Sequence, residues 1–416
     1  MSLSFNLFSK PNQQKTPKLH TPHCRYQLWS VILTTTMNTT TILDRDSLGT
    51  WKHIDFFLLG CIALVVMIGV CFVASAARGM PDLGGSAGLA GRQALFICIG
   101  VAFFTAIQRV SYLTILRHAP LLYLVGLLLL CGVFGTHAIK GAHKWFNLYL
   151  FKLQPSELMK PIMILTLAHY LMYRDSYKKL AGLIVPLVLA MVPMLLILKQ
   201  PDLGTMLAFV PVILAMLFAA GARLWHLVLM VFCGAGGLTG MWFTVMHPYQ
   251  KLRVLAWLHP EQYRVREAWQ LLRSESAIGS GGFFGKGWGE SGQNGLNFLP
   301  EKHTDFIFAV VAEEGGFFMG ALLLLLIFLT ALSGLGIAAR TREPAGRLIA
   351  VGCVMMLCSQ VLINSGVALG LLPTTGLTFP FVSYGGSSVI SSFICLGLLV
   401  NIGTQREPVL ARDDFE

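Results

Sequence analysis

The sequence predicts an all-α, polytopic integral membrane protein with about ten transmembrane helices and one long outer loop between spans seven and eight. Three observations predict this class. Charged side chains make up 12% of the 416 residues, about half the share of a soluble domain, whereas apolar residues make up 55%. The mean hydropathy is +0.67. Apolar runs long enough to cross the roughly 30 Å hydrocarbon core of a bilayer also recur along the chain.

The spans follow from the apolar runs and the polar breaks between them, because a helix needs about 20 apolar residues to cross the bilayer. Several runs are shorter, as expected of tilted or buried helices. The predicted spans are residues 56–75, 93–108, 119–135, 157–173, 180–198, 203–220, 224–246, 306–337, 348–368 and 386–403.

Two polar tails are predicted to flank the membrane domain of residues 51–405. Residues 1–50 are rich in Thr, Lys and Pro and lack the continuous apolar core of a signal peptide, so we expect a disordered cytoplasmic tail. Met37 offers a second start, so residues 1–36 are either an overlong start or a real extension. Residues 406–416 are predicted to be a cytoplasmic C-terminal tail.

The Lys and Arg residues set the predicted orientation. An even number of spans puts both termini on one side, and short loops rich in Lys and Arg face the cytoplasm. With the termini inside, the short inner loops hold Arg109, Arg117, Arg174, Lys178, Lys179, Arg223, Arg340, Arg342 and Arg347, and the short outer loops hold Arg78, Arg92, Lys140, Lys144, Lys152 and Lys199. The outer cations either bind something anionic or are tolerated. We assign the net charge of +11 to orientation and anionic head groups, and expect no nucleic acid partner.

The outer loop of residues 247–305 is long enough that we expect it to be functional or disordered. Between Tyr249 and Arg273, aromatic, aliphatic and basic residues recur at helix-like spacing, which predicts amphipathic helices at the membrane interface. The Gly-rich stretch from Gly279 to Gly295 predicts turns.

Several other kinds of site are excluded. The cysteines lie in apolar runs apart from Cys24, and without a CxxC pair they support neither a disulfide framework nor a zinc site. Residues 287–292 fit GxGxxG, but no strand is predicted before them, so a dinucleotide site fails its context.

A first candidate cluster combines Lys144 with the start of span four, where the sequence reads QPSELMKP. Glu157 and Lys160 are three residues apart and share one helix face. Pro161 removes the hydrogen bond to the Glu157 carbonyl, which predicts a bend. The cluster is either a charged site at a kink or an internal ion pair with a helix cap.

A second candidate is Asp202, in the short connection between spans five and six. Aspartate is a preferred N-cap, so Asp202 can simply cap span six. Alternatively, Asp202 faces Lys160 or a metal ion in a shared outer cavity.

A third cluster lies where the long loop re-enters the membrane, and it contains Lys302, His303, Thr304 and Asp305. Asp305 is predicted in the first turn of span eight, at the level where water gives way to lipid. A carboxylate placed there can accept a proton from a bound hydroxyl, as a general base does. The alternative is that Thr304 or Asp305 only caps the helix.

A fourth segment, residues 372–388, separates spans nine and ten. Its small residues, prolines and hydroxyls, including Ser383 and Tyr384, predict re-entrant backbone that lines a cavity. Asn364 adds a polar group below it. Tight helix packing is the alternative.

Five motifs, in this order across the ten spans, closely resemble the SEDS family of bacterial wall polymerases: QPSELMK, QPDLGT, FLPEKHTDFIFAVVAEE, GLLPTTG and PFVSYGGSS. The resemblance covers residues 50–405. The GKGW at 285–288 and the stretch YQKLRVLAWLHPEQ are more similar to the elongation member, RodA, than to the division member, FtsW. Two departures, His259 and the RSES at 273–276, lead us to expect that this part of the loop is shaped differently or meets a partner differently.

The resemblance implies a peptidoglycan glycosyltransferase of the bacterial cytoplasmic (inner) membrane that polymerises lipid II on the outer leaflet for cell elongation and rod shape. It implies as partners a class B penicillin-binding transpeptidase and other elongation-complex membrane proteins. The family's essential acidic residue falls on Asp305. The acidic-basic pair falls on Glu157 and Lys160, and the aspartate of QPDLGT on Asp202. We expect the substrate to be bound by Lys144, Glu157, Lys160, Asp202, Lys302, His303, Thr304, Ser383 and Tyr384.

In the implied mechanism, Asp305 deprotonates the GlcNAc 4-hydroxyl of one lipid II, which attacks the anomeric carbon of MurNAc on the growing chain. Undecaprenyl pyrophosphate leaves, and cations such as Lys144, Lys160 and loop arginines stabilise its charge. No organic cofactor is expected, and a divalent cation, Mg²⁺ or Mn²⁺, can share the task. Two alternatives are a lipid II flippase, which tolerates Asp305→Asn, and a non-catalytic scaffold for the transpeptidase, which tolerates loss of the whole outer cluster.

Overall fold

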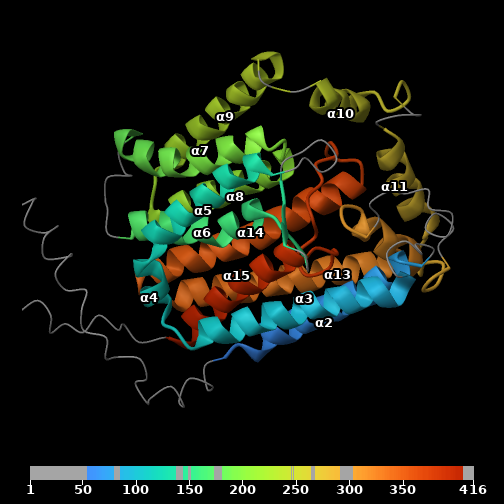
Figure 1. The fold of residues 1–416 in the computed structure, drawn as a ribbon, viewed down its shortest axis with the longest axis horizontal. Coiled ribbons are helices and arrows are strands. Elements are labelled where there is room, and N and C mark those ends of the chain that lie inside the picture. Colours follow the sequence, from blue (N-terminus) through green and yellow to red (C-terminus); the bar gives the residue numbers. More distant parts are fainter. Residues whose placement is uncertain are drawn as a thin grey trace, which may run out of the picture. The chain divides into compact units, whose positions relative to one another are not determined.

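The computed structural model describes residues 54–78, 85–136, 144–148, 151–172, 180–244, 246, 248–263, 268–290 and 303–405, and within these ranges it is nearly all helical (Figure 1). All of them belong to one unit, Thr50–Glu416. The predicted N-terminal tail, Lys302 and residues 406–416 lie outside the described residues.

A helix is found at every predicted span. In chain order these are α2 (Phe56–Ala76), α3 (Gly85–Gln108), α5 (Ala119–Gly132), α6 (Pro155–Leu171), α7 (Ile184–Lys199), α8 (Leu203–Ala220), α9 (Leu224–Thr244), α13 (Ile307–Arg340), α14 (Pro344–Ala368) and α15 (Gly386–Thr404). Within the described ranges, eight helices are long and apolar enough to cross a membrane, and Ala119–Gly135 is a shorter apolar helix. The remaining one, α6, has 17 residues and carries Glu157 and Lys160. The prediction of an all-α polytopic membrane protein is confirmed.

Shorter elements lie between the spans. The helix α4 (Tyr112–Arg117) joins α3 to α5. Two three-residue strands, β1 (Phe146–Leu148) and β2 (Phe151–Leu153), pair antiparallel with Phe146 opposite Leu153. The sequence did not predict this hairpin, because strands so short show no readable alternation.

The predicted amphipathic helices of the long loop are present as α10 (Pro248–Leu258) and α11 (Trp269–Ser280). Both dock on the end of α14. The Trp257 indole donates to the Gly370 carbonyl at 2.8 Å, and the buried Ser274 hydroxyl donates to the Ala368 carbonyl at 2.7 Å. The RSES stretch is therefore helical, and its first serine makes a docking contact.

Two prolines inside spans free a carbonyl that a neighbouring helix then satisfies. Proline lacks the N–H that would bond the carbonyl four residues earlier, and lipid supplies no replacement donor. Four residues before Pro161, the Glu157 carbonyl accepts a hydrogen bond from the Ser391 hydroxyl at 2.8 Å. Four residues before Pro193, the Leu189 carbonyl accepts a hydrogen bond from the Tyr123 hydroxyl at 2.8 Å.

The span predicted at residues 306–337 is broken at Gly316, where φ is +68°. A side chain there would overlap the backbone of Phe283 and Gly285. The loop after α11 replaces the lost helical bonds: Phe317 N donates to Gly282 O, Phe318 N to Phe283 O, Lys286 N to Glu313 O and Gly287 N to Glu314 O. At 1.5 Å per residue, the piece after the kink is about 36 Å long and spans a bilayer by itself.

The helices α14 and α15 form the centre of the bundle (Figure 1). In the most apolar stretch of each helix, 72% of the residues of α14 and 83% of those of α15 are buried. In the corresponding stretch of α9, none is buried. α15 packs on α3, and α14 packs on α8 and α13. The elements that carry the outer polar residues thus pack on two largely buried helices.

Candidate functional site

Asp305 lies just before α13 and is half-buried. The N-cap of α13 is Phe306, whose side chain makes no capping hydrogen bond. Neither Thr304 nor Asp305 therefore occupies the N-cap position that the cap alternative expected. The prediction that Asp305 lies in the first turn is also wrong, because the helix begins only at Ile307.

A small cavity of about 20 Å³ adjoins Asp305. It is formed by α10, α11, the start of α13, α14 and the segment before α15, through Arg253, Gln270, Asp305, Phe306, Asn364, Val367, Thr374, Thr375, Gly376 and Leu377. Gly376 has a φ of +72°, and a Cβ there would lie 3.3 Å from Oδ2 of Asp305. The chain at residues 375–376 therefore runs directly beside the carboxylate.

Asn364 holds the backbone of Asp305 in place. Its side chain is 1% exposed, and its Nδ2 donates to the carbonyl oxygens of Asp305 at 2.8 Å and Leu377 at 2.6 Å. One amide thus ties α14 to the two segments that face each other across the cavity.

The third and fourth predicted clusters come together. The Ser383 hydroxyl donates to the Thr304 carbonyl at 2.6 Å and accepts from Phe379 N at 2.8 Å. Tyr384 N donates to the His303 carbonyl at 2.9 Å, and the two rings lie 5.7 Å apart. Residues 373–377 line cavities, as predicted for this segment. These contacts are mainly to backbone, so they fix the shape of the site.

Glu157 and Lys160 form a buried ion pair on α6. The Lys160 Nζ lies 2.7 Å from both carboxylate oxygens of Glu157 and 2.8 Å from Oε1 of Gln360. Lys160 is 1% exposed and Glu157 is 4% exposed. The internal ion pair considered above is therefore present. A role of the pair in substrate binding stays a prediction.

Asp202 caps α8, accepting from Thr205 N at 3.5 Å and from the Thr205 hydroxyl at 3.1 Å. It also accepts from Nε2 of Gln154 at 2.9 Å, and the Lys144 ammonium lies 3.9 Å away. The cation facing Asp202 is thus Lys144, whereas Lys160 is engaged by Glu157 and Gln360.

The predicted divalent cation finds no ready-made site here. Within the described ranges, no three His, Cys, Asp or Glu side chains are grouped so as to hold a metal. The oxygens of Glu157 and Asp202 are engaged by Lys160, Gln154 and Thr205. These two carboxylates do not fit a metal site, and we derive no step through one.

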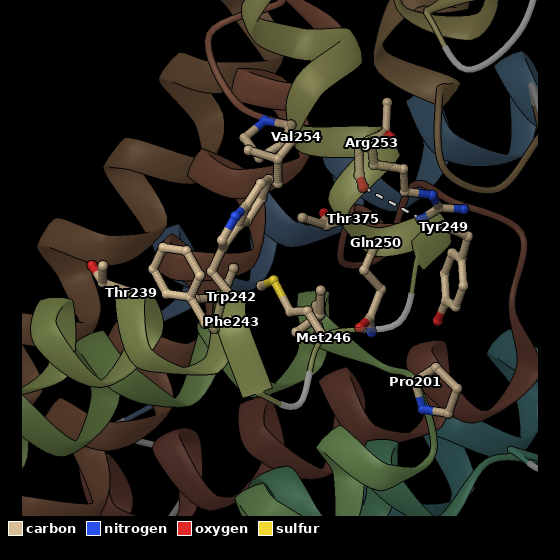
Figure 2. Close-up of a pocket in the computed structure, with 14 residues that line it drawn as sticks. Pro201, Thr239, Trp242, Phe243, Met246, Tyr249, Gln250, Arg253, Val254 and Thr375 are labelled. Atoms are coloured by element: carbon tan, nitrogen blue, oxygen red, sulfur yellow. Dashed lines mark hydrogen bonds between the residues drawn. The ribbon is translucent and has the colours of Figure 1, made fainter.

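A second, apolar cavity of about 410 Å³ lies beside the first, and sequence analysis missed it (Figure 2). The lining residues come from α8, α9, α10 and the segment before α15: Pro201, Leu203, Leu207, Thr239, Trp242, Phe243, Met246, Tyr249, Gln250, Arg253, Val254, Pro373, Thr374 and Thr375. The available signal was the aromatic and aliphatic character of residues 242–258, which a membrane interface explains equally well.

Arg253 borders both cavities, and Figure 2 shows it reaching from α10. Its Nη1 donates to the Thr374 carbonyl at 3.3 Å, and its guanidinium lies 5.9 Å from the centre of the Tyr249 ring. Burial raises the pKa of the Tyr249 phenol, and the Arg253 charge opposes this rise. Most guanidinium donors of Arg253 remain available, because its side chain is exposed.

Two buried carboxylates that sequence analysis did not single out lie at the α13 kink. The Lys286 ammonium lies 2.8 Å from Oε1 of Glu313. Glu314 accepts from the Ser75 hydroxyl at 2.7 Å and from Gly289 N at 3.2 Å. Both glutamates stand in the AVVAEE run, so a pair of acids in an apolar run was the signal. Through Lys286 and Gly289, Glu313 and Glu314 hold the Gly-rich loop against the kink.

Comparisons with known proteins agree on one family. The chain matches the model of the FTSW_RODA_SPOVE family, described as cell cycle protein, over residues 55–408. It is 36% identical over 374 residues to the probable peptidoglycan glycosyltransferase FtsW of Trichlorobacter lovleyi, covering 86% of this chain and 96% of that protein. It is 36% identical over 357 residues to the peptidoglycan glycosyltransferase MrdB of Escherichia coli K12, covering 85% and 95%.

A solved structure supports the same relationship. It concerns the structural coordination of polymerization and crosslinking by a peptidoglycan synthase complex, and one of its chains aligns with a TM-score of 0.73 at 32% identity, covering 85% of this chain and 98% of that one. Relatives named FtsW and MrdB are equally similar, so identity does not separate the division member from the elongation member. The chain belongs to the FtsW/RodA/SpoVE (SEDS) family.

Proposed function

We propose that this chain is a peptidoglycan glycosyltransferase that polymerises lipid II at the outer face of the cytoplasmic membrane. The observation that carries the proposal is Asp305, a half-buried carboxylate that lies just before α13 and borders a cavity. The names of the two relatives, both peptidoglycan glycosyltransferases, support the reaction class. The apolar cavity that adjoins the cavity of Asp305 suits a lipid-linked sugar better than a sugar nucleotide.

In the proposed reaction, Asp305 accepts the proton of the GlcNAc 4-hydroxyl as its oxygen attacks the anomeric carbon of the MurNAc that carries the growing chain. The bond from that carbon to the pyrophosphate oxygen breaks, and the electron pair leaves with undecaprenyl pyrophosphate. The proton rests on Asp305 until solvent removes it. Because the leaving group takes its charge onto phosphate, a positioned cation assists more than a second acid.

The two adjoining cavities support a placement for the lipid-linked donor. The apolar cavity suits the first isoprene units of the polyprenyl chain, since it is lined mainly by aromatic and aliphatic side chains. Arg253 lies between this cavity and Asp305, where the pyrophosphate of such a lipid would lie. A guanidinium is well suited to phosphate, because its fork of N–H groups binds two oxygens at once.

We further propose that the chain serves cell elongation with a class B penicillin-binding transpeptidase. The GKGW and YQKLRVLAWLHPEQ motifs support the elongation role, and the similarity to a chain of a synthase complex supports the partner. Expression in cells depleted of their own elongation polymerase is expected to restore rod shape, whereas cells depleted of the division polymerase are expected to keep filamenting. The reverse pattern would assign the chain to division.

The decisive test is polymerisation of labelled lipid II by the purified protein with its cognate transpeptidase, wild type beside Asp305→Asn. Asp55→Asn is the matched control, because Asp55 caps α2 through Leu58 N and asparagine caps equally well. We expect glycan strands from wild type and Asp55→Asn and none from Asp305→Asn. Equal amounts of glycan strands from all three proteins would show that Asp305 is not the general base. An inactive wild type that still binds the transpeptidase would favour a flippase or a scaffold.

A further inference from the structure

Two buried polar atoms beside Asp305 have no hydrogen-bond partner among the residues that the structure describes: Oδ1 of Asn364 and Oγ1 of Thr375. The orientation of the Asn364 amide is fixed, since its nitrogen lies 2.8 and 2.6 Å from two carbonyl oxygens and must be the donor. Its oxygen is therefore an acceptor. Buried polar atoms are satisfied in the great majority of cases, so this pair calls for an occupant.

Both residues line the cavity of about 20 Å³ that Asp305 also lines. A cavity needs about 10 to 15 Å³ to hold one water molecule, so this one holds a single water and no sugar ring. The neighbouring Gly376 brings the chain close to Oδ2 of Asp305, where a Cβ would lie at 3.3 Å. Asn364, Thr375 and Asp305 thus border one small space.

Counting donors and acceptors selects the occupant. The space offers two acceptors, the Asp305 carboxylate and Oδ1 of Asn364, and one hydroxyl, Thr375, that can donate. A water molecule can accept from the Thr375 hydroxyl and donate to Oδ1 of Asn364, and its second hydrogen can bond the carboxylate. A sugar hydroxyl has a single hydrogen, so it can donate to only one of the two acceptors. A metal cation would have to share the cavity with the guanidinium of Arg253.

We propose that Asn364 and Thr375 are positioning residues that hold one water molecule against the Asp305 carboxylate and so fix its rotation. The inference rests on the proposed function, in which Asp305 is the general base. A carboxylate has two oxygens, and a bond from the water to one of them leaves the other aimed at the acceptor hydroxyl. Thr375 acts through the water, and Asn364 also holds the backbone of Asp305.

The kinetic test compares Thr375→Val with Thr375→Ser. Valine has nearly the same shape as threonine but lacks the hydroxyl, whereas serine keeps it. Thr166→Val is the matched control, because the Thr166 hydroxyl bonds only the Ile162 carbonyl of its own helix. Loss of one hydrogen bond to the water is expected to lower kcat about tenfold with KM for lipid II within about twofold, and serine is expected to restore kcat. Equal kcat in Thr375→Val and wild type would overturn the positioning role.

A structure at a resolution that shows ordered water tests the occupant without relying on activity. We expect one water within about 2.6 to 3.2 Å of both Asn364 Oδ1 and Thr375 Oγ1 in wild type, and its loss or displacement in Thr375→Val. No density, or an occupant about 2.0 to 2.1 Å from these oxygens as for Mg²⁺, would overturn the assignment. If Asp305→Asn polymerises normally, the general base fails as a proposal, while the density alone still decides whether the water is held.

Discussion

Asp202 and Asp305 both lie at the start of a helix, but their surroundings differ. Asp202 binds the backbone of its own helix as an N-cap and is surrounded by Gln154, Thr205 and Lys144. Asp305 instead precedes the N-cap position of α13, which Phe306 occupies, and it borders a cavity. Substitution by asparagine therefore separates structure from chemistry at these sites, because asparagine caps as well as aspartate but accepts no proton.

The pair of Glu157 and Lys160 belongs to the residue scale as well, and it makes a prediction about stability. Lys160→Met leaves the Glu157 charge buried without a cation, which is expected to destabilise the fold by about 3 to 5 kcal/mol. Adding Glu157→Gln to that variant removes the charge and is expected to restore most of the loss. Thermal unfolding in detergent measures both, with the exposed Lys152→Met as the control. A double variant no more stable than the single one would contradict this.

Arg253 gives a prediction about binding. Arg253→Gln removes the charge between the two cavities and is expected to raise KM for lipid II about tenfold or more, because the pyrophosphate loses a charged partner. Arg253→Lys keeps the positive charge but lacks the fork of guanidinium N–H groups, so its KM is expected to lie between those of wild type and Arg253→Gln. Steady-state polymerisation measures the series. An unchanged KM in Arg253→Gln would place the pyrophosphate elsewhere.

At the scale of the element, the α13 kink sets the direction of the helical piece that follows Asp305. The Gly-rich loop supplies the hydrogen bonds that the helix loses at Gly316, and the Lys286–Glu313 pair and the Glu314 contacts hold that loop. The piece of α13 next to Asp305 therefore has its direction set by a segment that precedes it in the chain.

Two glycines of α13 test the kink. Gly316→Ala forces a Cβ into a positive φ and against the backbone of Phe283 and Gly285, so we expect a loss of about 3 kcal/mol in stability. Gly336→Ala, in the regular part of the same helix with open space around it, is expected to be neutral or stabilising by up to ~1 kcal/mol. Thermal unfolding of the two variants decides, and similar midpoints would show that the kink is not required.

At the scale of the whole molecule, the site exists only where distant segments meet. The apolar cavity is built from α8, α9, α10 and residues 373–375, and it adjoins the cavity of Asp305 through Arg253. In the proposed function, a lipid-linked substrate bound there would be held at both its chain and its head.

The cavity makes a prediction about chain length. Trp242→Ala removes apolar surface from the cavity wall, so KM is expected to rise for lipid II with the full polyprenyl chain and to change little for a short-chain analogue. Trp225→Ala is the control on the same helix, since Trp225 is 73% exposed and lies outside the cavity. Equal effects of the two substitutions, or an equal effect on both substrates, would remove the polyprenyl chain from this cavity.

Apolar length and polar breaks in the sequence determined the membrane class and the ten helices, because crossing lipid imposes a minimum run that local composition reveals. The motifs also identified Asp305, Asp202 and the Glu157–Lys160 pair. Only the tertiary structure decided that Lys144 faces Asp202, that Gly316 breaks α13, and that Asn364 and Thr375 line one cavity with Asp305. These are contacts between segments far apart in the chain, and their geometry depends on how whole helices pack, which no local pattern of residues encodes.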